Sequence, residues 1–393
     1  LDGVPQDISD EEVCCMPDPA GAVVLPWKTD TALIPSDLWC QGAPFEPCSR
    51  NILGRQVERA AAMGFSMNLG MEAEFFVFRD ESGAPKPISQ LPHLDKPAYD
   101  TTRILDNIGW LQALVDAMND LGWGVYSFDH EDGIGQFEID FAYAHVRTMA
   151  DRYVFLRMMA SAIARNHGAY ASFMPKPYVD RAGSGAHFNM SLADPASGEN
   201  LFHDPDDPRK CGLSTLGYQF LAGVLRHLPA IMATVAPTVN SYKRLVAQGS
   251  MSGFTWAPVF ACYGNNNRTN AMRIPLGGGR VELRAADSAC NPYLGAAMCL
   301  AAGLEGIEEG LDPGEPNYEN MYKVPEEERK KRGIEMLPRT LDEAVEAFKA
   351  DPLSKAVFGE AMFDAWTSYK EEEWLAYLNH VSDWETDRYL RFF

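Results

Sequence analysis

Acidic side chains with metal-binding chemistry recur at alternating positions in two short segments of the sequence. In residues 67–78, Glu72 and Glu74 stand two positions apart, so in a strand both carboxylates point to the same side. In residues 135–141, Glu138 stands in the same way between apolar neighbours. If these polar sides line one cavity, the carboxylates cannot all stay ionised without cations. Carboxylate oxygens are preferred ligands of Mg²⁺ and Mn²⁺, so the pattern predicts a metal site.

Two further segments add an imidazole and arginines to this chemistry. The polar positions that share a side are His187, Asn189 and Ser191 in residues 186–192, and Arg280, Glu282 and Arg284 in residues 280–285. Taken alone, each segment also fits a half-buried antiparallel strand with one wet side. The four segments together argue against that alternative, because their polar positions are almost all Glu, His, Arg, Asn or Gln and include no Lys. Carboxylates, a hard metal and several arginines indicate phosphoryl transfer from a nucleotide.

Basic side chains are concentrated late in an otherwise acidic chain. The stretch from position 244 to position 284 contains five arginines: Arg244, Arg268, Arg273, Arg280 and Arg284. Its one acidic residue is Glu282. A surface role is the alternative for the first three of these arginines, which stand in polar, loop-like surroundings. As a group they predict a positive cluster that suits a polyanionic ligand such as ATP.

The elements that must position these residues alternate irregularly between helices and strands. Apolar spacing and helix-ending glycines predict helices from residue 51 onward, over 108–120, 149–166, 216–232 and 292–309, and from residue 341 to the end. The polar run 326–332 is expected to be a solvated face or loop. No long alternation of parallel strands with helices is visible. The pattern therefore predicts a mixed α+β architecture.

Composition excludes several classes of protein. The 393 residues are 46% hydrophobic and carry a formal charge of −21, which excludes a mainly disordered chain and disfavours partners such as nucleic acid or an anionic membrane. Eight cysteines without a CxxC pair predict a reducing, cytoplasmic location. No apolar stretch is long enough to span a membrane. Residues 1–50 are acidic and rich in proline, and are too short for a core of their own.

Six motifs in order identify a family resemblance from about residue 25 to the end of the chain. They are GMEAEFFVF (70–78), HEDGIGQFEI (130–139), GSGAHFNMSL (183–192), APTVNSYKRL (236–245), NNRTNAMRIP (266–275) and RVELRAADSACNPYL (280–294). The chain resembles the glutamine synthetase superfamily, type I-like. The resemblance implies a catalytic domain over 47–393, built as an open barrel of antiparallel strands flanked by helices. It also implies that 1–46 is the C-terminal remnant of a small β-grasp domain.

The resemblance also implies a role for each candidate site residue. One metal would be bound by Glu74, Glu131 and Glu138, and a second by Glu72, His187 and Glu282. Substrate glutamate would be bound by Gly183, Arg244, Arg268 and Arg284. The nucleotide and its phosphates would be bound by Asn189, Ser191, Arg268, Arg273 and Arg280. Glu131, Arg268 and Arg284 would be catalytic, and two or three Mg²⁺ or Mn²⁺ ions would occupy each active site.

The reaction that the resemblance implies has two steps, in which ATP phosphorylates the γ-carboxylate of L-glutamate and an amine then displaces phosphate. The family's flap carries a glutamate that closes the ammonium pocket, whereas residues 246–267 of this chain contain no acid. Losing that charge favours methylamine over ammonia, and the segment 183–192 is more similar to glutamate–methylamine ligases. The alternatives are glutamine synthesis from ammonia, ligation of a polyamine, and a non-catalytic structural homologue.

Two further expectations follow from the same resemblance. Subunits should assemble into a homo-oligomer, a dodecamer of two stacked hexameric rings, with each active site between neighbouring subunits. Tyr322 stands in NMYKVPEEE, which is similar to the loop that carries an adenylylated tyrosine in some family members. An unmodified loop tyrosine is the favoured interpretation of that residue.

Overall fold

The strand β6 (Ser66–Glu81) is the central strand of a ten-stranded sheet in this computed structural model, which describes residues 12–89, 91, 97–246 and 257–393. Its apolar side chains alternate with half-buried polar ones from Ser66 to Glu74. Neighbouring strands follow the order β13 (Tyr263–Asn265), β14 (Met272–Ile274), β15 (Val281–Leu283), β12 (Ala186–Ala193), β6, β9 (Gln136–Phe141) and β8 (Val125–His130). The alternation gives the sheet one apolar and one polar side.

The sheet is antiparallel at almost every pairing, as the sequence predicts. Three short strands also pair with β6: β7 (Ala84–Pro87), β10 (Ala144–His145) and β11 (Tyr170–Ser172). The exception to the expected pattern is the parallel pair β13–β14. The strand order does not return to β13, so the described strands form an open sheet.

Helices predicted from the sequence occur close to their expected bounds. They are α1 (Ser49–Ala62), α3 (Ile108–Asp120), α4 (Val146–Asn166), α5 (Thr215–Val235) and α7 (Pro292–Glu308). α4 starts three residues earlier than expected because the His145 side chain accepts a hydrogen bond from Arg147 N–H at 3.4 Å and so caps the helix. The remaining helical segments are η1 (Pro19–Gly21), α2 (Thr101–Asp106), α6 (Ser241–Arg244), η2 (Met321–Lys323), α8 (Glu326–Lys331), α9 (Leu341–Ala350), α10 (Pro352–Phe358), α11 (Glu360–Leu378) and α12 (Asp383–Tyr389).

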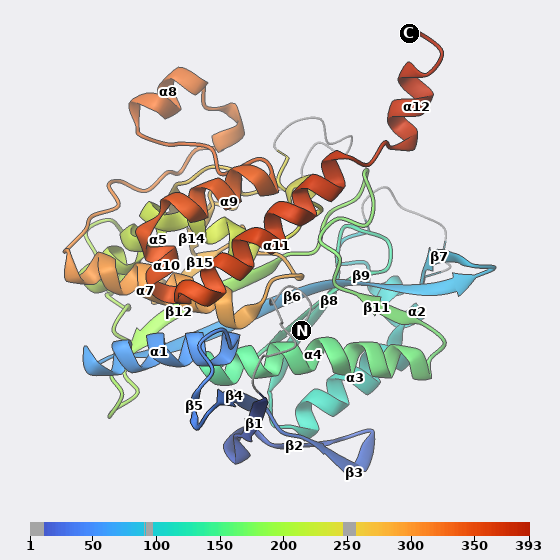
Figure 1. Cartoon of the computed structure of the whole chain (residues 1–393), viewed down its shortest axis with the longest axis horizontal. Helices are drawn as coiled ribbons and strands as arrows, with labels where there is room; N and C mark the ends of the chain where they lie inside the picture. Colours follow the sequence, from blue (N-terminus) through green and yellow to red (C-terminus); the bar gives the residue numbers. More distant parts are fainter. Residues whose placement is uncertain (1–11, 90, 92–96, 247–256) are drawn as a thin grey trace.

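Helices cover the apolar side of the sheet, where the core lies. Phe188 of β12 and Met71 of β6 are register partners and are both buried on that side. α1 and α4 run alongside β6 (Figure 1). α5 and α7 cross closely because Gly223 stands at their contact, where an added Cβ would lie 2.0 Å from the Ala302 carbonyl oxygen. The polar side of the sheet therefore remains available for a site.

The N-terminal strands are attached to the body through a buried arginine. β1 (Val13–Pro17), β4 (Ser36–Cys40) and β5 (Ala43–Pro44) form one small sheet, and β2 (Val23–Leu25) with β3 (Lys28–Leu33) forms a second. The guanidinium of Arg50, which is 4% exposed, binds Asp18 at 2.7 Å, Asp37 at 2.8 Å and Asp151 of α4 at 2.9 Å. The boundary between residues 46 and 47 stays a prediction.

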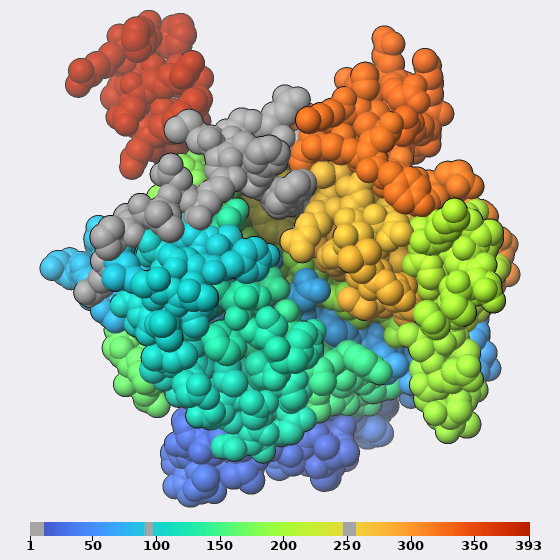
Figure 2. Space-filling model, turned by 180° about the vertical axis from the view of Figure 1, so that it is seen from behind, coloured from blue at the N-terminus to red at the C-terminus, as the bar shows by residue number. Residues whose placement is uncertain are grey.

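The N-terminal strands and the C-terminal helix α12 lie at opposite ends of the molecule (Figure 2). Figure 2 shows the N-terminal strands in dark blue at one end and α12 in red standing away from the body at the other. Apolar side chains of this C-terminal part, among them Trp384 and Phe393, are exposed. Among the residues described, no helix combines the length and apolar character that crossing a bilayer requires.

Candidate active site

Polar side chains from β6, β9 and β12 meet because of the strand register. Glu72 of β6 is the register partner of His187 on β12. Glu74, two residues further along β6, is the partner of Glu138 on β9. Because residues directly opposite in antiparallel strands point to the same side of the sheet, the predicted polar sides coincide. The structure therefore brings together side chains separated by more than a hundred residues.

Glu72, His187 and Glu282 form a group that fits a divalent cation. His187 Nδ1 lies 2.6 Å from Glu72 Oε2 and 3.7 Å from Glu282 Oε1. One potential ligand atom from each residue lies within 4.8 Å of the others. Burial opposes ionisation of Glu72, but the hydrogen bond and charge of His187 outweigh it and lower the Glu72 pKa to about 2. Two carboxylates and an imidazole match the donors that Mn²⁺ and Mg²⁺ accept.

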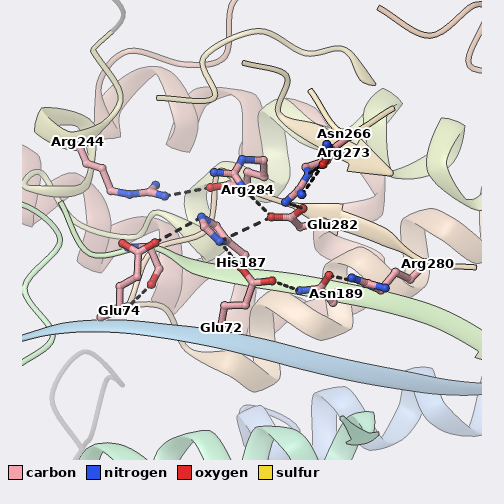
Figure 3. Close-up of polar contacts among 12 residues, drawn as sticks. Glu72, Glu74, His187, Asn189, Arg244, Asn266, Arg273, Arg280, Glu282 and Arg284 are labelled. Carbon is pink, nitrogen blue, oxygen red and sulfur yellow. Dashed lines mark hydrogen bonds and ion pairs between the residues drawn. The ribbon is translucent and has the colours of Figure 1, made fainter. Parts of the chain in front are cut away.

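Two arginines hold both oxygens of Glu282 (Figure 3). The Glu282 side chain is fully buried. Arg273 Nη1 lies 2.8 Å from its Oε2, and Arg284 Nη1 lies 2.5 Å from its Oε1. A cation bound by Glu282 would compete with these arginines for the same oxygens. It would thereby free their guanidinium groups to face an anionic ligand.

The second predicted metal group consists of carboxylates that destabilise one another's charge. Glu74 Oε2 accepts a hydrogen bond from Gly185 N–H at 2.7 Å. Burial and the charge of Glu74 raise the pKa of Glu131 to about 8. Burial and the same neighbour raise the pKa of Glu138 well above its usual range. A cation among these three groups would relieve that repulsion.

One cavity of about 350 Å³ gathers most of the predicted site. The predicted residues on its wall are Glu72, Glu74, Glu131, Glu138, Gly183, His187, Arg244, Arg268, Arg273, Arg280 and Arg284. Asn189 and Ser191 line an adjacent cavity of about 480 Å³, and Glu72 and Arg280 line both. Glu282 is buried beside the first cavity and is absent from both linings. Arg268 is exposed at the wall, whereas Arg284 is buried.

Asn189 connects the two cavities by hydrogen bonds. Its Nδ2 donates to Glu72 Oε1 at 2.9 Å, and its Oδ1 accepts from Arg280 Nε at 3.0 Å (Figure 3). The amide therefore joins a candidate metal ligand to a candidate phosphate-binding arginine. Tyr126 and Tyr143 are exposed beside Asn189 in the larger cavity, where they offer aromatic surface to a ligand.

Two glycines make room for Arg244. A Cβ on Gly183 would lie 2.4 Å from the Pro175 carbonyl oxygen and 2.9 Å from Arg244 Cγ. A Cβ on Gly185 would lie 2.9 Å from Arg244 Nη2. The guanidinium itself donates to the carbonyl of Ala285 at 3.1 Å and to that of Arg284 at 3.0 Å. The glycine-rich turn, ambiguous in the sequence, thus seats this arginine at the cavity.

Several cavity residues were not predicted as site residues. Asp140 alternates with Glu138 on β9, and burial with the charge of Glu72 raises its pKa to about 7. The same alternation that indicates Glu138 could have identified Asp140. Lys176 and Tyr99 come from loops, where no periodicity points to them. Gln136, which is buried and donates to the Gly183 carbonyl at 3.0 Å, is not among the predicted site residues either.

Part of the segment without an acid, residues 247–256, lies outside the described residues, which resume at Ala257. Ala257 and Pro258 line the cavity beside the carboxylates and so add apolar surface to it. The Tyr322 hydroxyl donates to the Ala257 carbonyl at 2.6 Å and is half-buried. This contact favours the interpretation of Tyr322 as an unmodified loop tyrosine.

Comparison with known proteins places this geometry in a family. Residues 46–389 match the model described as glutamine synthetase, catalytic domain. The chain is 40% identical to the glutamate–methylamine ligase of Methyloversatilis universalis, over 98% of this chain and 86% of that protein. It is 38% identical to a glutamine synthetase of Rhizobium leguminosarum bv. phaseoli, over 96% of this chain and 85% of that protein.

Solved structures give the same result. One described as a GmaS/ADP complex superposes with a TM-score of 0.91 at 37% identity, covering 99% of this chain and 87% of that one. Another, described as a novel glutamine synthase homolog, superposes with a TM-score of 0.80 at 29% identity, covering 99% of this chain and 86% of that one. The fold therefore agrees with the sequence match.

Proposed function

The chain belongs to the family of glutamine synthetase catalytic domains, and on that premise we propose that it is an ATP-dependent ligase that joins methylamine to the γ-carboxylate of L-glutamate. The observation that carries the proposal is the meeting of Glu72, Glu74 and Glu138 opposite a group of arginines at one cavity. The similarity to a glutamate–methylamine ligase and the apolar wall at Ala257 support the choice of amine.

In the first step, the γ-carboxylate oxygen attacks the terminal phosphorus of ATP, and the bond to ADP breaks. We assign Arg244 and Arg284 to the carboxylates of glutamate, with Gly183 allowing close approach. Arg273 and Arg280 would bind phosphates beside Asn189 and Ser191. Arg268, exposed at the cavity wall, would offset the charge on the transferred phosphoryl group.

In the second step, the amine nitrogen attacks the acyl phosphate, forms the amide and expels phosphate. Methylammonium must first lose a proton because its pKa, like that of a lysine side chain, is about 10. We assign the proton to Glu131, which is also a proposed metal ligand and would accept the proton on an oxygen that does not bind the ion. The pocket that holds the methyl group is expected to include Ala257 and Pro258, which line the same cavity.

We further propose that Glu74, Glu131 and Glu138 bind one Mg²⁺ or Mn²⁺ ion and that Glu72, His187 and Glu282 bind another, with a third ion allowed per site. Such ions polarise phosphoryl oxygens and neutralise negative charge when bound. We expect the active enzyme to be a dodecamer in the cytoplasm. Sedimentation of the purified protein tests the assembly.

Phosphate release with ATP, Mg²⁺ and glutamate tests the function when ammonia, methylamine, ethylamine and putrescine are compared. Methylamine should lead by about tenfold in kcat/KM, a difference of ~1.4 kcal/mol. Leading activity with ammonia would make the protein a glutamine synthetase, and leading activity with putrescine a polyamine ligase. No release with any amine, and no thermal shift with ATP and Mg²⁺, would favour a structural homologue.

A further inference from the structure

Glu373 on α11 holds the chain segment that leads to Arg244. Its Oε1 accepts a hydrogen bond from Val239 N–H at 3.0 Å. Its Oε2 pairs with Lys370 Nζ at 2.8 Å. Val239 stands two residues before α6, the four-residue helix Ser241–Arg244. Helix α11 thus contacts the backbone five residues before a cavity arginine, Arg244.

The contact at Val239 belongs to a set that fixes a helix too short to be stable alone. Asn240 Oδ1 accepts from Lys176 N–H at 2.7 Å, and its Nδ2 donates to the Lys176 carbonyl at 3.1 Å. At the other end, Lys243 Nζ lies 5.1 Å from the ring centre of Tyr377 on α11. Because so short a helix has few internal hydrogen bonds, these external contacts determine its position.

The carboxylate of Glu373 is itself fixed by a buried cation. Lys370 is 5% exposed, and its Nζ lies 5.1 Å from the ring centre of Trp366 and 5.0 Å from that of Tyr369. Glu373 is the carboxylate that pairs with this ammonium group. Because the buried ammonium group of Lys370 would be destabilised without a paired carboxylate, it restrains Glu373. The carboxylate that accepts from Val239 N–H is therefore held in place.

A displacement of α6 would move Arg244 within the cavity. The aliphatic part of Arg244 packs on Gly183, and its guanidinium lies beside Gly185, near Glu74 and His187. Its two hydrogen bonds to carbonyl groups have fixed geometry. A shift of even about 1 Å would misalign the guanidinium with a bound carboxylate.

We propose that Glu373 is a positioning residue for substrate glutamate. It fixes the position of Arg244 and thereby sets the affinity for glutamate. The inference rests on the proposed function, in which Arg244 binds a carboxylate of glutamate. Glu373 does not line the cavity and so does not touch substrate. Its effect should therefore fall on affinity for glutamate and spare the nucleotide.

Kinetics of Glu373→Ala in the full chain, with glutamate and ATP varied separately, test this inference. KM for glutamate should rise about tenfold, the loss expected for one hydrogen bond, while KM for ATP stays within about twofold. Glu373→Gln keeps an acceptor for Val239 and should restore KM for glutamate. Glu371→Ala is the matched control, because Glu371 lies on the same helix and bonds Lys349 at the surface.

The double variant Lys370→Met/Glu373→Ala separates positioning from stability. It removes the cation that Glu373→Ala leaves unpaired, so the melting temperature should recover while KM for glutamate stays high. Recovery of KM for glutamate together with stability in the double variant would overturn the proposal. Equal rises in KM for glutamate and KM for ATP in Glu373→Ala would also overturn it, as would a Glu373→Gln variant that behaves like Glu373→Ala. If the wild type releases no phosphate with any amine, the proposed function fails. Calorimetric titration with glutamate would then still compare the affinity of the variants for glutamate.

Discussion

Glu74 and Glu138 stand directly opposite each other as antiparallel partners on β6 and β9. Side chains at such positions have Cβ atoms about 5 Å apart, so two ionised carboxylates there repel each other. Burial, and after it the charge of Glu74, raises the pKa values of Glu138 and Glu131. The free energy of unfolding must therefore depend on both pH and metal.

Metal-free protein should lose stability as the pH rises. The pKa of Glu131 is about 8 in the folded chain, above its value in the unfolded chain, so the folded state binds more protons between those values. Stability consequently falls as the pH rises from about 5 to about 8. Melting temperatures measured in chelator across that range test this, and Mg²⁺ at the upper pH should restore most of the loss.

Glu138→Gln supplies the control for this prediction. The variant removes one of the repelling charges, so its metal-free melting temperature should change less with pH than that of the wild type. It should also respond less to Mg²⁺, because a neutral amide is a poorer ligand. A wild type whose stability is flat from about pH 5 to about pH 8 would contradict the assignment.

Replacing Glu282 with glutamine should affect stability and turnover together. The substitution leaves Arg273 and Arg284 without the charge that both bind, at a residue that is fully buried. We expect a loss of about 3 kcal/mol in the free energy of unfolding, measured by urea titration. kcat should fall by about a hundredfold or more.

Glu319→Gln is the matched control for Glu282. Glu319 pairs with Arg332 at 2.7 Å, but its side chain is 57% exposed. Because solvent screens such a pair, the variant should lose less than about 1 kcal/mol. Equal losses in the two variants would show that burial of Glu282 does not matter.

Gly183→Ala should impair glutamate binding. The added methyl group would meet the Pro175 carbonyl, which is backbone and cannot move aside, as well as the stem of Arg244. We expect a destabilisation of about 1–3 kcal/mol and a higher KM for glutamate. Gly54→Ala in α1 is the control, because no atom lies within 4 Å of the new Cβ. It should stabilise the helix by about 0.5–1 kcal/mol.

His227 should stabilise the protein more at low than at high pH. Its Nδ1 lies 2.7 Å from Asp351 Oδ2, and its Nε2 lies 2.9 Å from Glu305 Oε1. Burial opposes the charged imidazole, but the two carboxylates outweigh it and raise the pKa of His227. A raised pKa contributes stability that is lost as the pH passes above it.

His227→Gln measures that contribution by urea unfolding at two pH values. The variant should lose more stability relative to wild type at about pH 6 than at about pH 9. Arg226 on the same helix, which binds Glu305 and Glu309, faces one of these carboxylates, so both measurements should be made at equal salt. A loss that is independent of pH would mean that His227 acts through packing alone.

Local periodicity explains which parts of the site could be predicted from the sequence. Alternation along β6 puts Glu72 and Glu74 on one side, and the same rule applies to His187 and Asn189 on β12. Which strands become neighbours depends on tertiary packing. That Glu72 faces His187 therefore came from the family resemblance, not from spacing.

Residues that reach the site from loops could not be predicted in this way. Tyr99 lies in a turn with a φ of 61°, and Lys176 precedes the glycine-rich turn. The binding of Glu282 by Arg273 could not be predicted either, because the two residues become partners only when β14 pairs with β15. The parallel pairing of β13 with β14 has no local signal either.

The bond network around Arg50 has a consequence for a cleaved chain. Among the described residues, the small N-terminal sheets share no strand pairing with the large one. They are joined to the body by Arg50, which binds carboxylates from both sides, and by Arg147 of α4, which binds Asp37. A peptide bond cut in the β4–β5 turn, near the exposed Gly42, would leave the fragment that carries Asp18 and Asp37 bound to the remainder. Gel filtration should then show one particle near neutral pH and two in acid, where protonated carboxyl groups release the arginine.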